Sequence, residues 1–124
     1  VANEDSIILF LNINHLLSTC PSSCIHHQKL IHNLVGVLSN KILILNNKIT
    51  HTSKRTTRDK LLSYLSSESI RQGSLSFDIP FDRQQLADYL CVERAAMSAE
   101  ISKLKKEGLL TTNRNHFELK KKAV

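Results

Sequence analysis

The stretch RQQLADYLCVERAAMSAEISKLKKEGLL, residues 83–110, contains two apolar-periodic segments with only a few residues between them. In its second half Met97, Ile101 and Leu104 recur at spacings of four and three, which predicts a helix with one inward stripe. Gly108 follows where a helix C-terminus favours a residue that tolerates positive φ. The outward face of this helix would carry small residues and lysines, namely Ala95, Ala99, Ser102, Lys103 and Lys106.

The first half of the stretch predicts a shorter helix. Its apolar side comprises Leu86, Ala87 and Leu90. Asp82 with Gln85 resembles a capping box, Phe81 with Leu86 fits a hydrophobic staple, and Pro80 would prevent an earlier start. Two helices at this spacing are typical of a helix-turn-helix, whose second helix enters the major groove of DNA. An ordinary helical hairpin with a solvated basic face fits the same spacing.

The charge of the chain is unevenly distributed. The 124 residues carry a net charge of +6, with a pI of about 9.4. Residues 53–124 hold 14 Lys and Arg against 9 Asp and Glu, whereas residues 1–52 hold 3 against 2. The half with the helix pair is therefore the basic half, as an interface with double-stranded DNA requires. A solvated, soluble surface is the alternative explanation of this charge.

The cysteines are few, at positions 20, 24 and 91. An odd, sparse set without a signal peptide predicts a reducing cytoplasm. Cys20 and Cys24 with His26 and His27 have a metal-like spacing, but no second ligand pair follows, so we expect packed thiols, no metal and no cofactor. The longest apolar run, IILFL, is too short to span a bilayer, and no membrane partner is expected. Residue 1 is Val rather than Met, as expected of a piece of a longer chain.

Candidate catalytic groups are scattered. Cys91 or Ser98 would need a base and an oriented acid to act as a nucleophile. His116 and Asp88 are present, but no motif connects them to either residue. We therefore expect that the chain is not an enzyme.

The N-terminal half predicts a strand and two helices. Residues 6–11, SIILFL, have the pattern of a buried strand, residues 12–20 that of a short helix begun by Asn12, and Pro21–Ser23 that of a break. From Cys24 to about Thr52 a long helix is expected, because apolar residues recur at alternating spacings of 4 and 3. This heptad seam comprises Ile31, Val35, Leu38, Ile42, Leu45, Ile49 and Thr52. So regular a seam favours pairing with a second copy, and packing on the core of its own domain is the alternative.

The C-terminal half predicts a helix, a strand and a hairpin. Thr56 with Asp59 fits a capping box for a helix that Gly73 ends. The apolar side of this helix would be Leu61, Leu62, Leu65 and Ile70. The stretch SLSFDIPF, residues 74–81, alternates as a short strand, and LLTTNRNHFEL, residues 109–119, predicts two strands around Asn113–Asn115. The fold class is therefore mainly α with a small antiparallel sheet, a winged helix-turn-helix whose wing tip carries Arg114.

Several motifs resemble the C-terminal part of the Crp/Fnr superfamily of bacterial transcription regulators. They are SKRTTRDKLLSYL, FDIPFDRQQLADYL, the pattern V-x-R-x-A-x-S in Val92–Ser98, and LKKEGLL followed by NHFEL. The resemblance covers essentially the whole chain. It implies that residues 1–23 are the end of a truncated β-roll sensor domain, residues 24–52 a dimerisation helix and residues 53–124 a winged helix-turn-helix domain. It also implies a homodimeric, DNA-binding regulator, with RNA polymerase as a possible further partner.

The chain departs from the family pattern at two positions. Cys91 stands where the family often has Gly in the turn, and Ala99 where members often place a base-reading Arg. Arg94 matches the first reading arginine of the family, so base recognition is expected to rest on it. The expected DNA-binding residues are Gln84, Arg94, Ala95, Ser98, Ala99, Lys103 and Arg114. No Gly-rich phosphate cassette is present, so this piece is not expected to bind a cyclic nucleotide.

Ala99 leaves a second function open. Alanine can contact a thymine methyl but cannot form a bidentate bond to guanine. The alternative to a DNA-reading regulator is therefore an interaction fragment, which pairs with a full-length regulator through the heptad helix without reading DNA itself.

Overall fold

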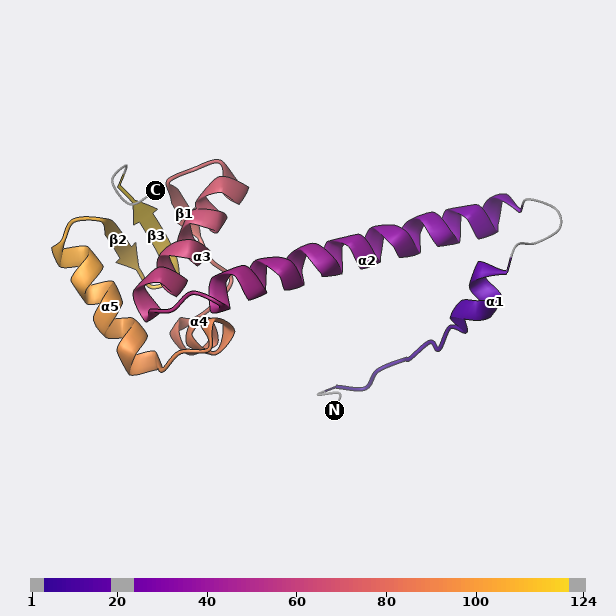
Figure 1. The fold of residues 1–124 in the computed structure, drawn as a ribbon, viewed down its shortest axis with the longest axis horizontal. Coiled ribbons are helices and arrows are strands. Elements are labelled where there is room, and N and C mark those ends of the chain that lie inside the picture. The colour runs from indigo at the N-terminus through magenta and orange to yellow at the C-terminus, as the bar shows by residue number, and fades with distance from the viewer. Residues whose placement is uncertain (1–3, 19–23, 121–124) are drawn as a thin grey trace. The chain divides into compact units, whose positions relative to one another are not determined.

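A computed structural model of the chain describes residues 4–18 and 24–120 (Figure 1). The chain divides into two units, Val1–Leu43 and Ile44–Val124. The elements in chain order are α1 (Ile13–Leu17), α2 (Ile25–Thr52), α3 (Thr57–Gln72), β1 (Ser76–Asp78), α4 (Arg83–Leu90), α5 (Arg94–Lys106), β2 (Leu110–Asn113) and β3 (His116–Leu119). The predicted fold class, mainly α with a small antiparallel sheet, is confirmed.

The first unit begins with an extended segment and α1. Asn12 caps α1 as predicted, because its side chain accepts hydrogen bonds from the backbone N–H groups of Asn14 and His15. The buried strand predicted for residues 6–11 is wrong, since this segment has no regular structure and Ile7 is 104% exposed. A strand needs a neighbour for its backbone hydrogen bonds, and no strand lies beside the segment among the residues that the structure describes. The predicted break at Pro21–Ser23 lies outside the described residues.

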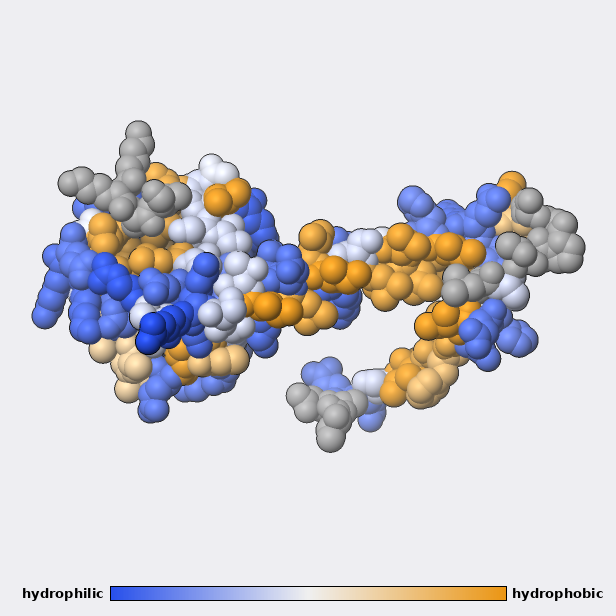
Figure 2. Space-filling model, in the orientation of Figure 1, coloured by the Kyte–Doolittle hydropathy of each residue, from blue (hydrophilic) through white to orange (hydrophobic). Residues whose placement is uncertain are grey.

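The long helix α2 runs through residues 25–52, as predicted to within one residue. Its seam residues Val35, Leu38 and Ile42 are exposed, Leu38 to 52%. Figure 2 shows apolar side chains along the surface of this helix. Pairing with a second copy and packing on its own domain therefore both stay open for this seam.

Helix α3, in the second unit, begins with the predicted cap. Thr56 accepts a hydrogen bond from the backbone N–H of Asp59 (3.0 Å). The Asp59 carboxylate accepts from the Thr56 hydroxyl (2.7 Å) instead of reaching back to the backbone of residue 56, so the capping box is only half formed. Gly73 ends the helix in the left-handed conformation, with φ of 64°.

One prediction for the apolar side of α3 is wrong. Leu61 and Leu65 are fully buried, but Ile70 is 75% exposed. At about 100° per residue, Ile70 lies about 180° around the helix from Leu61. Ser69 is buried in its place, and its hydroxyl donates a hydrogen bond to the carbonyl of Ser74 (2.7 Å).

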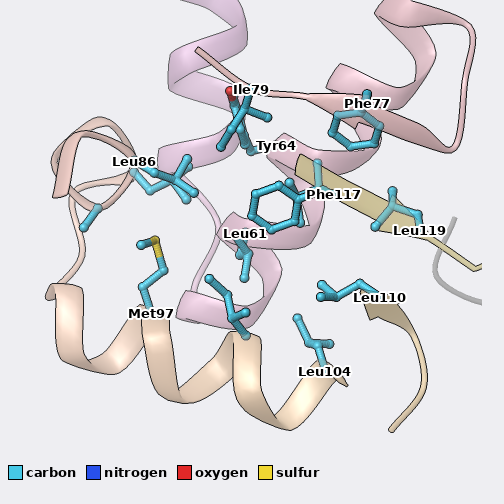
Figure 3. Close-up of a cluster of buried hydrophobic side chains, with 14 residues drawn as sticks. Leu61, Tyr64, Phe77, Ile79, Leu86, Met97, Leu104, Leu110, Phe117 and Leu119 are labelled. Carbon is cyan, nitrogen blue, oxygen red and sulfur yellow. The ribbon is translucent and has the colours of Figure 1, made fainter. Parts of the chain in front are cut away.

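The core of the second unit lies between its helices and the sheet, whose strand order is β1-β3-β2 with both pairs antiparallel. Phe117 of the central strand is fully buried and lies opposite Phe77 of β1. Figure 3 shows these rings among side chains from the helices. The largest fully buried side chains are Phe117, Leu61, Leu65, Leu86, Leu90, Met97, Leu104 and Leu110. The apolar sides predicted for the two helices of residues 83–110 are therefore confirmed.

The helix pair itself forms by local signals. Asp82 and Gln85 make the predicted capping box at the start of α4. The helix ends at Cys91, whose φ of 52° and ψ of 54° are left-handed. Gly108, with φ of 70°, follows α5 as predicted. Cys91 therefore adopts a conformation that favours glycine.

Replacing Cys91 with glycine should stabilise the second unit. A non-glycine residue in the left-handed region costs about 1–2 kcal/mol, while glycine adds unfolded-state entropy that offsets part of the gain. We expect the free energy of unfolding to rise by about 0.5–1 kcal/mol in urea denaturation. Cys91→Ala removes the same exposed thiol but leaves a side chain in the left-handed conformation, so it should give no such gain. An equal gain in both variants would assign the effect to the thiol.

His51 occupies the last turn of α2 and is buried against α3. Its Nδ1 lies 2.9 Å from the Ser63 hydroxyl oxygen, and its ring meets that of Tyr64 edge to face at 5.8 Å. Burial lowers the pKa of His51 from its ordinary value of 6.5; Glu68 opposes this shift and Lys54 adds to it. The neutral imidazole is thus the form that this contact favours.

The free energy of unfolding should fall in acid because of His51. Its pKa is lower in the folded than in the unfolded state, so the unfolded chain binds the extra proton as the pH drops below about 6.5. The loss of unfolding free energy grows until the pH has fallen to the pKa of His51 in the folded state. His51→Gln should give a shallower dependence in denaturation measured between neutral pH and mild acid. Equal slopes for the two proteins would show that His51 does not drive the loss.

Candidate nucleic-acid interface

The seven residues expected to bind DNA are all exposed, and they lie on three elements. Gln84 lies at the start of α4, Arg94 is the first residue of α5, and Arg114 is in the turn between β2 and β3. These three residues line one hollow of about 410 Å³, together with Asp82, Arg83 and Asn115. The tertiary structure thus brings together groups that are far apart in the sequence.

The remaining expected residues lie along the exposed face of α5. Ala95, Ser98 and Ala99 are small and exposed, whereas Met97 points into the core. Ala99 and Lys103 line a second hollow of about 320 Å³, with Thr56, Thr57, Arg58, Ala96 and Glu100. Five of the seven expected residues are therefore divided between two hollows, while Ala95 and Ser98 line neither of them.

The cations of the two hollows differ in their partners. Arg94 and Arg114 form no hydrogen bond or ion pair with any of residues 4–18 and 24–120. Lys103, in contrast, lies 2.7 Å from Glu100, with its side chain 63% exposed. Arg58 forms a bidentate ion pair with Glu107 through its two terminal guanidinium nitrogens, Nη1 and Nη2. The first hollow thus presents free guanidinium groups, and the second presents cations that are partly neutralised by their own chain.

Some polar side chains of the interface form hydrogen bonds within their own helix. The Gln84 amide donates to the Asp88 carboxylate (2.9 Å), and the Ser102 hydroxyl donates to the carbonyl of Ser98 (2.9 Å). The Ser98 hydroxyl has no partner among the described residues. Arg114 has φ of 52°, so the guanidinium of the wing tip is carried by a left-handed residue in a tight turn.

Arg83 lines the first hollow but is not among the residues predicted from the sequence. Its Nη2 donates to the Thr112 hydroxyl (2.8 Å), and its guanidinium lies 4.8 Å from the centre of the Phe117 ring. Its Nη1 is buried and has no hydrogen-bond partner in the part of the chain that the structure describes. Burial lowers the pKa of this guanidinium from its ordinary value. No local signal distinguishes Arg83 in the polar run DRQQ, because its partners are on β2 and β3.

The residues considered for catalysis and metal binding are dispersed. Asp88 accepts from Gln84, while His116 bonds Asp78 and Ser76 instead, so His116 and Asp88 are engaged with different groups. Cys20 lies outside the described residues, and Cys24 is half-buried. Within residues 4–18 and 24–120, no three His, Cys, Asp or Glu side chains are grouped to hold a metal ion. No described helix is both long and apolar enough to cross a membrane.

Residues 59–123, which contain the helix pair, the sheet and the first hollow, match the Crp-like helix-turn-helix domain. The chain belongs to this family. It is also 30% identical over 66 residues to the transcriptional activator protein FnrL of Cereibacter sphaeroides. That match takes in 46% of this chain and 27% of FnrL, so the chain spans only about a quarter of the length of that relative.

The Crp-like assignment confirms the resemblance seen in the sequence motifs. The chain matches the C-terminal part of Crp/Fnr-type regulators, and it carries a DNA-binding domain of transcription regulators. DNA is thereby supported as a partner. In this Crp-like domain the first hollow, with its unpaired arginines, lies at the beginning of the second helix of the helix-turn-helix.

Proposed function

We propose that this Crp-like chain is a homodimeric regulator that reads a specific DNA sequence. In this proposal residues 24–52 are the dimerisation helix, residues 53–124 are the DNA-reading domain, and residues 1–23 are the end of a sensor domain. The observation that carries the proposal is the first hollow, where Arg94 and Arg114 are unpaired with any described residue next to the small-residue face of α5. A transcriptional activator among its relatives favours RNA polymerase as a further partner.

The heptad seam supports the homodimer. In the last turns of α2, Ile44 and His51 face α3 and α4, where they line one cavity. At about 100° per residue, Leu45 and Ile49 lie about 100–160° around the helix from Ile44 and His51. Both are exposed. A second copy can therefore cover the seam without displacing the contacts of α2 with its own domain.

The two α5 helices of a dimer would enter successive major grooves about 34 Å apart. Arg94, at the N-terminal end of α5, would form a bidentate bond to guanine, while Ala95, Ser98 and Ala99 permit close approach and contact with thymine methyl groups. Gln84, Lys103 and Arg114 would hold phosphates, which position the domain without reading sequence. Arg94 and Arg114 have no ion pair with a described residue to break for this, whereas Lys103 must leave Glu100.

A titration of the whole chain with a matched and a scrambled duplex at two salt concentrations tests the proposal. A specific regulator should bind both duplexes, prefer the matched one, and lose affinity as salt rises. Absence of duplex binding at low salt would favour the alternative, an interaction fragment that pairs with a full-length regulator. Ala99 is the feature that supports that alternative.

The same titration checks the role of Lys103. Lys103→Ala should weaken binding to the matched and scrambled duplexes alike and reduce the salt slope by about one unit. Glu100→Gln should strengthen binding to both duplexes, because it releases Lys103 from an exposed ion pair that contributes only about 0–1 kcal/mol to stability. An unchanged salt slope in Lys103→Ala would exclude a phosphate contact at this position.

A further inference from the structure

A separate cavity of about 270 Å³ lies where the last turns of α2 meet α3 and α4. It shares no lining residue with either hollow of the DNA interface. Asn47 and His51 of α2 form one side, and the opposite side belongs to α3, α4 and the residues before α4. At about 100° per residue, Asn47 lies about 160° around the helix from Ile49 of the seam, so a dimer would leave the cavity open.

The apolar wall of this junction cavity is aromatic. Tyr64, Phe81 and Tyr89 line it, with neighbouring ring centroids 5.1–6.1 Å apart. The three rings pack on one another at tilts of 31–58°. Such a wall favours contact with a further planar ring, because tilted and offset aromatic pairs are stabilising at these separations.

The charge beside the cavity is positive. The Glu68 carboxylate lines the cavity but already accepts hydrogen bonds from Arg71 and Gln72. The Lys48 ammonium lies 5.4 Å from the centre of the Tyr89 ring, and it has no carboxylate partner among the described residues. A cationic ligand would therefore meet a neutralised carboxylate and a free lysine, whereas an anionic ligand would meet a partner.

We propose that the junction cavity binds a small aromatic carboxylate. Its ring would lie against Tyr64, Phe81 and Tyr89, and its carboxylate would pair with Lys48. The volume is below the usual range of about 300–1,000 Å³ for sites of drug-sized ligands, which favours a single-ring acid. This function is additional to DNA reading, and because α2, α3 and α4 all line the cavity, the ligand would hold the end of α2 to the DNA-reading domain.

Tyrosine fluorescence of the full chain provides a direct test. The chain has two tyrosines and no tryptophan, and both tyrosines line this cavity. Phenylacetate should produce a saturable change in tyrosine emission, and the neutral isostere phenylacetamide should bind at least about tenfold more weakly. No DNA is present, so the result is independent of whether the chain reads DNA. A strictly linear response to phenylacetate, or equal affinity for the amide, would overturn the proposal.

Three variants localise the site. Asn47→Phe should fill the cavity and weaken phenylacetate binding at least about tenfold, whereas Asn46→Phe, a matched change next to it that does not line the cavity, should leave binding unchanged. Lys48→Gln should weaken phenylacetate binding about tenfold but not that of the amide. Unchanged phenylacetate affinity in Asn47→Phe or in Lys48→Gln would contradict the proposed site.

Discussion

Replacing Leu38 with aspartate should separate the proposed dimer into monomers. Leu38 lies in the middle of the heptad seam and is exposed in the single chain. A second copy would bury the new carboxylate without a partner, and an isolated buried charge is among the most costly groups in a protein interface. We expect the dimer dissociation constant to rise at least about 100-fold, which corresponds to about 2.8 kcal/mol.

Sedimentation of the wild-type chain and of Leu38→Asp at micromolar concentration measures this effect. Asn40→Asp is the matched control, because Asn40 is exposed and lies about 160° around α2 from Leu38. It should leave the dimer intact. A wild-type chain that sediments as a monomer would exclude the homodimer, while a dimeric Leu38→Asp variant would place the interface elsewhere.

Arg94→Ala should remove sequence discrimination more than it removes affinity for DNA in general. Arg94 begins α5, is exposed and is unpaired with any described residue, at the helix end that normally meets the bases. Loss of a bidentate contact to guanine should cost about 1–3 kcal/mol on the matched site and flatten the preference at one base pair in each half-site. Binding to a scrambled duplex should change much less.

Arg94→Lys separates the charge of this residue from its geometry. Lysine keeps the positive charge but lacks the planar fork of the guanidinium, so binding to scrambled DNA should persist while discrimination falls. Arg71→Ala, a change of the same type outside both hollows, should leave discrimination intact. If Arg94→Ala lowered affinity for both duplexes equally, Arg94 would be a phosphate contact and the specificity would arise from another residue.

The two hollows suggest that base reading and phosphate binding occur at different ends of α5. The first hollow combines free guanidinium groups with the N-terminal end of the helix, where base edges are read. The second lies beside Lys103, two to three turns later, where cations are held by Glu100 and Glu107. In the proposed interface, acidic neighbours would weaken phosphate binding at the second hollow, and Glu100→Gln tests this expectation directly.

The sequence by itself determined the order of the helices and strands in the second unit. Helix ends are encoded within a few residues, as Asp82 with Gln85 shows at the start of α4 and Gly73 at the end of α3. The inward stripe of α5 follows equally from the spacing of its apolar residues, since the helical period alone decides which side chains share a face. The exposure of the expected interface residues could be predicted for the same reason, although their roles remain proposals.

Only the tertiary structure decided which neighbours each face meets. Ile70 was predicted to be buried because it is apolar, yet its side of α3 faces away from the core, and the small Ser69 is enclosed. Residues 6–11 have the composition of a buried strand but no described strand beside them. The contacts of Arg83 with Thr112 and Phe117, and the meeting of Arg94 with Arg114, join residues 20 or more positions apart. Helical periodicity and caps act between residues one or two turns apart. Strand pairing, side-chain burial and the partners of a charged side chain depend on segments that only folding brings together.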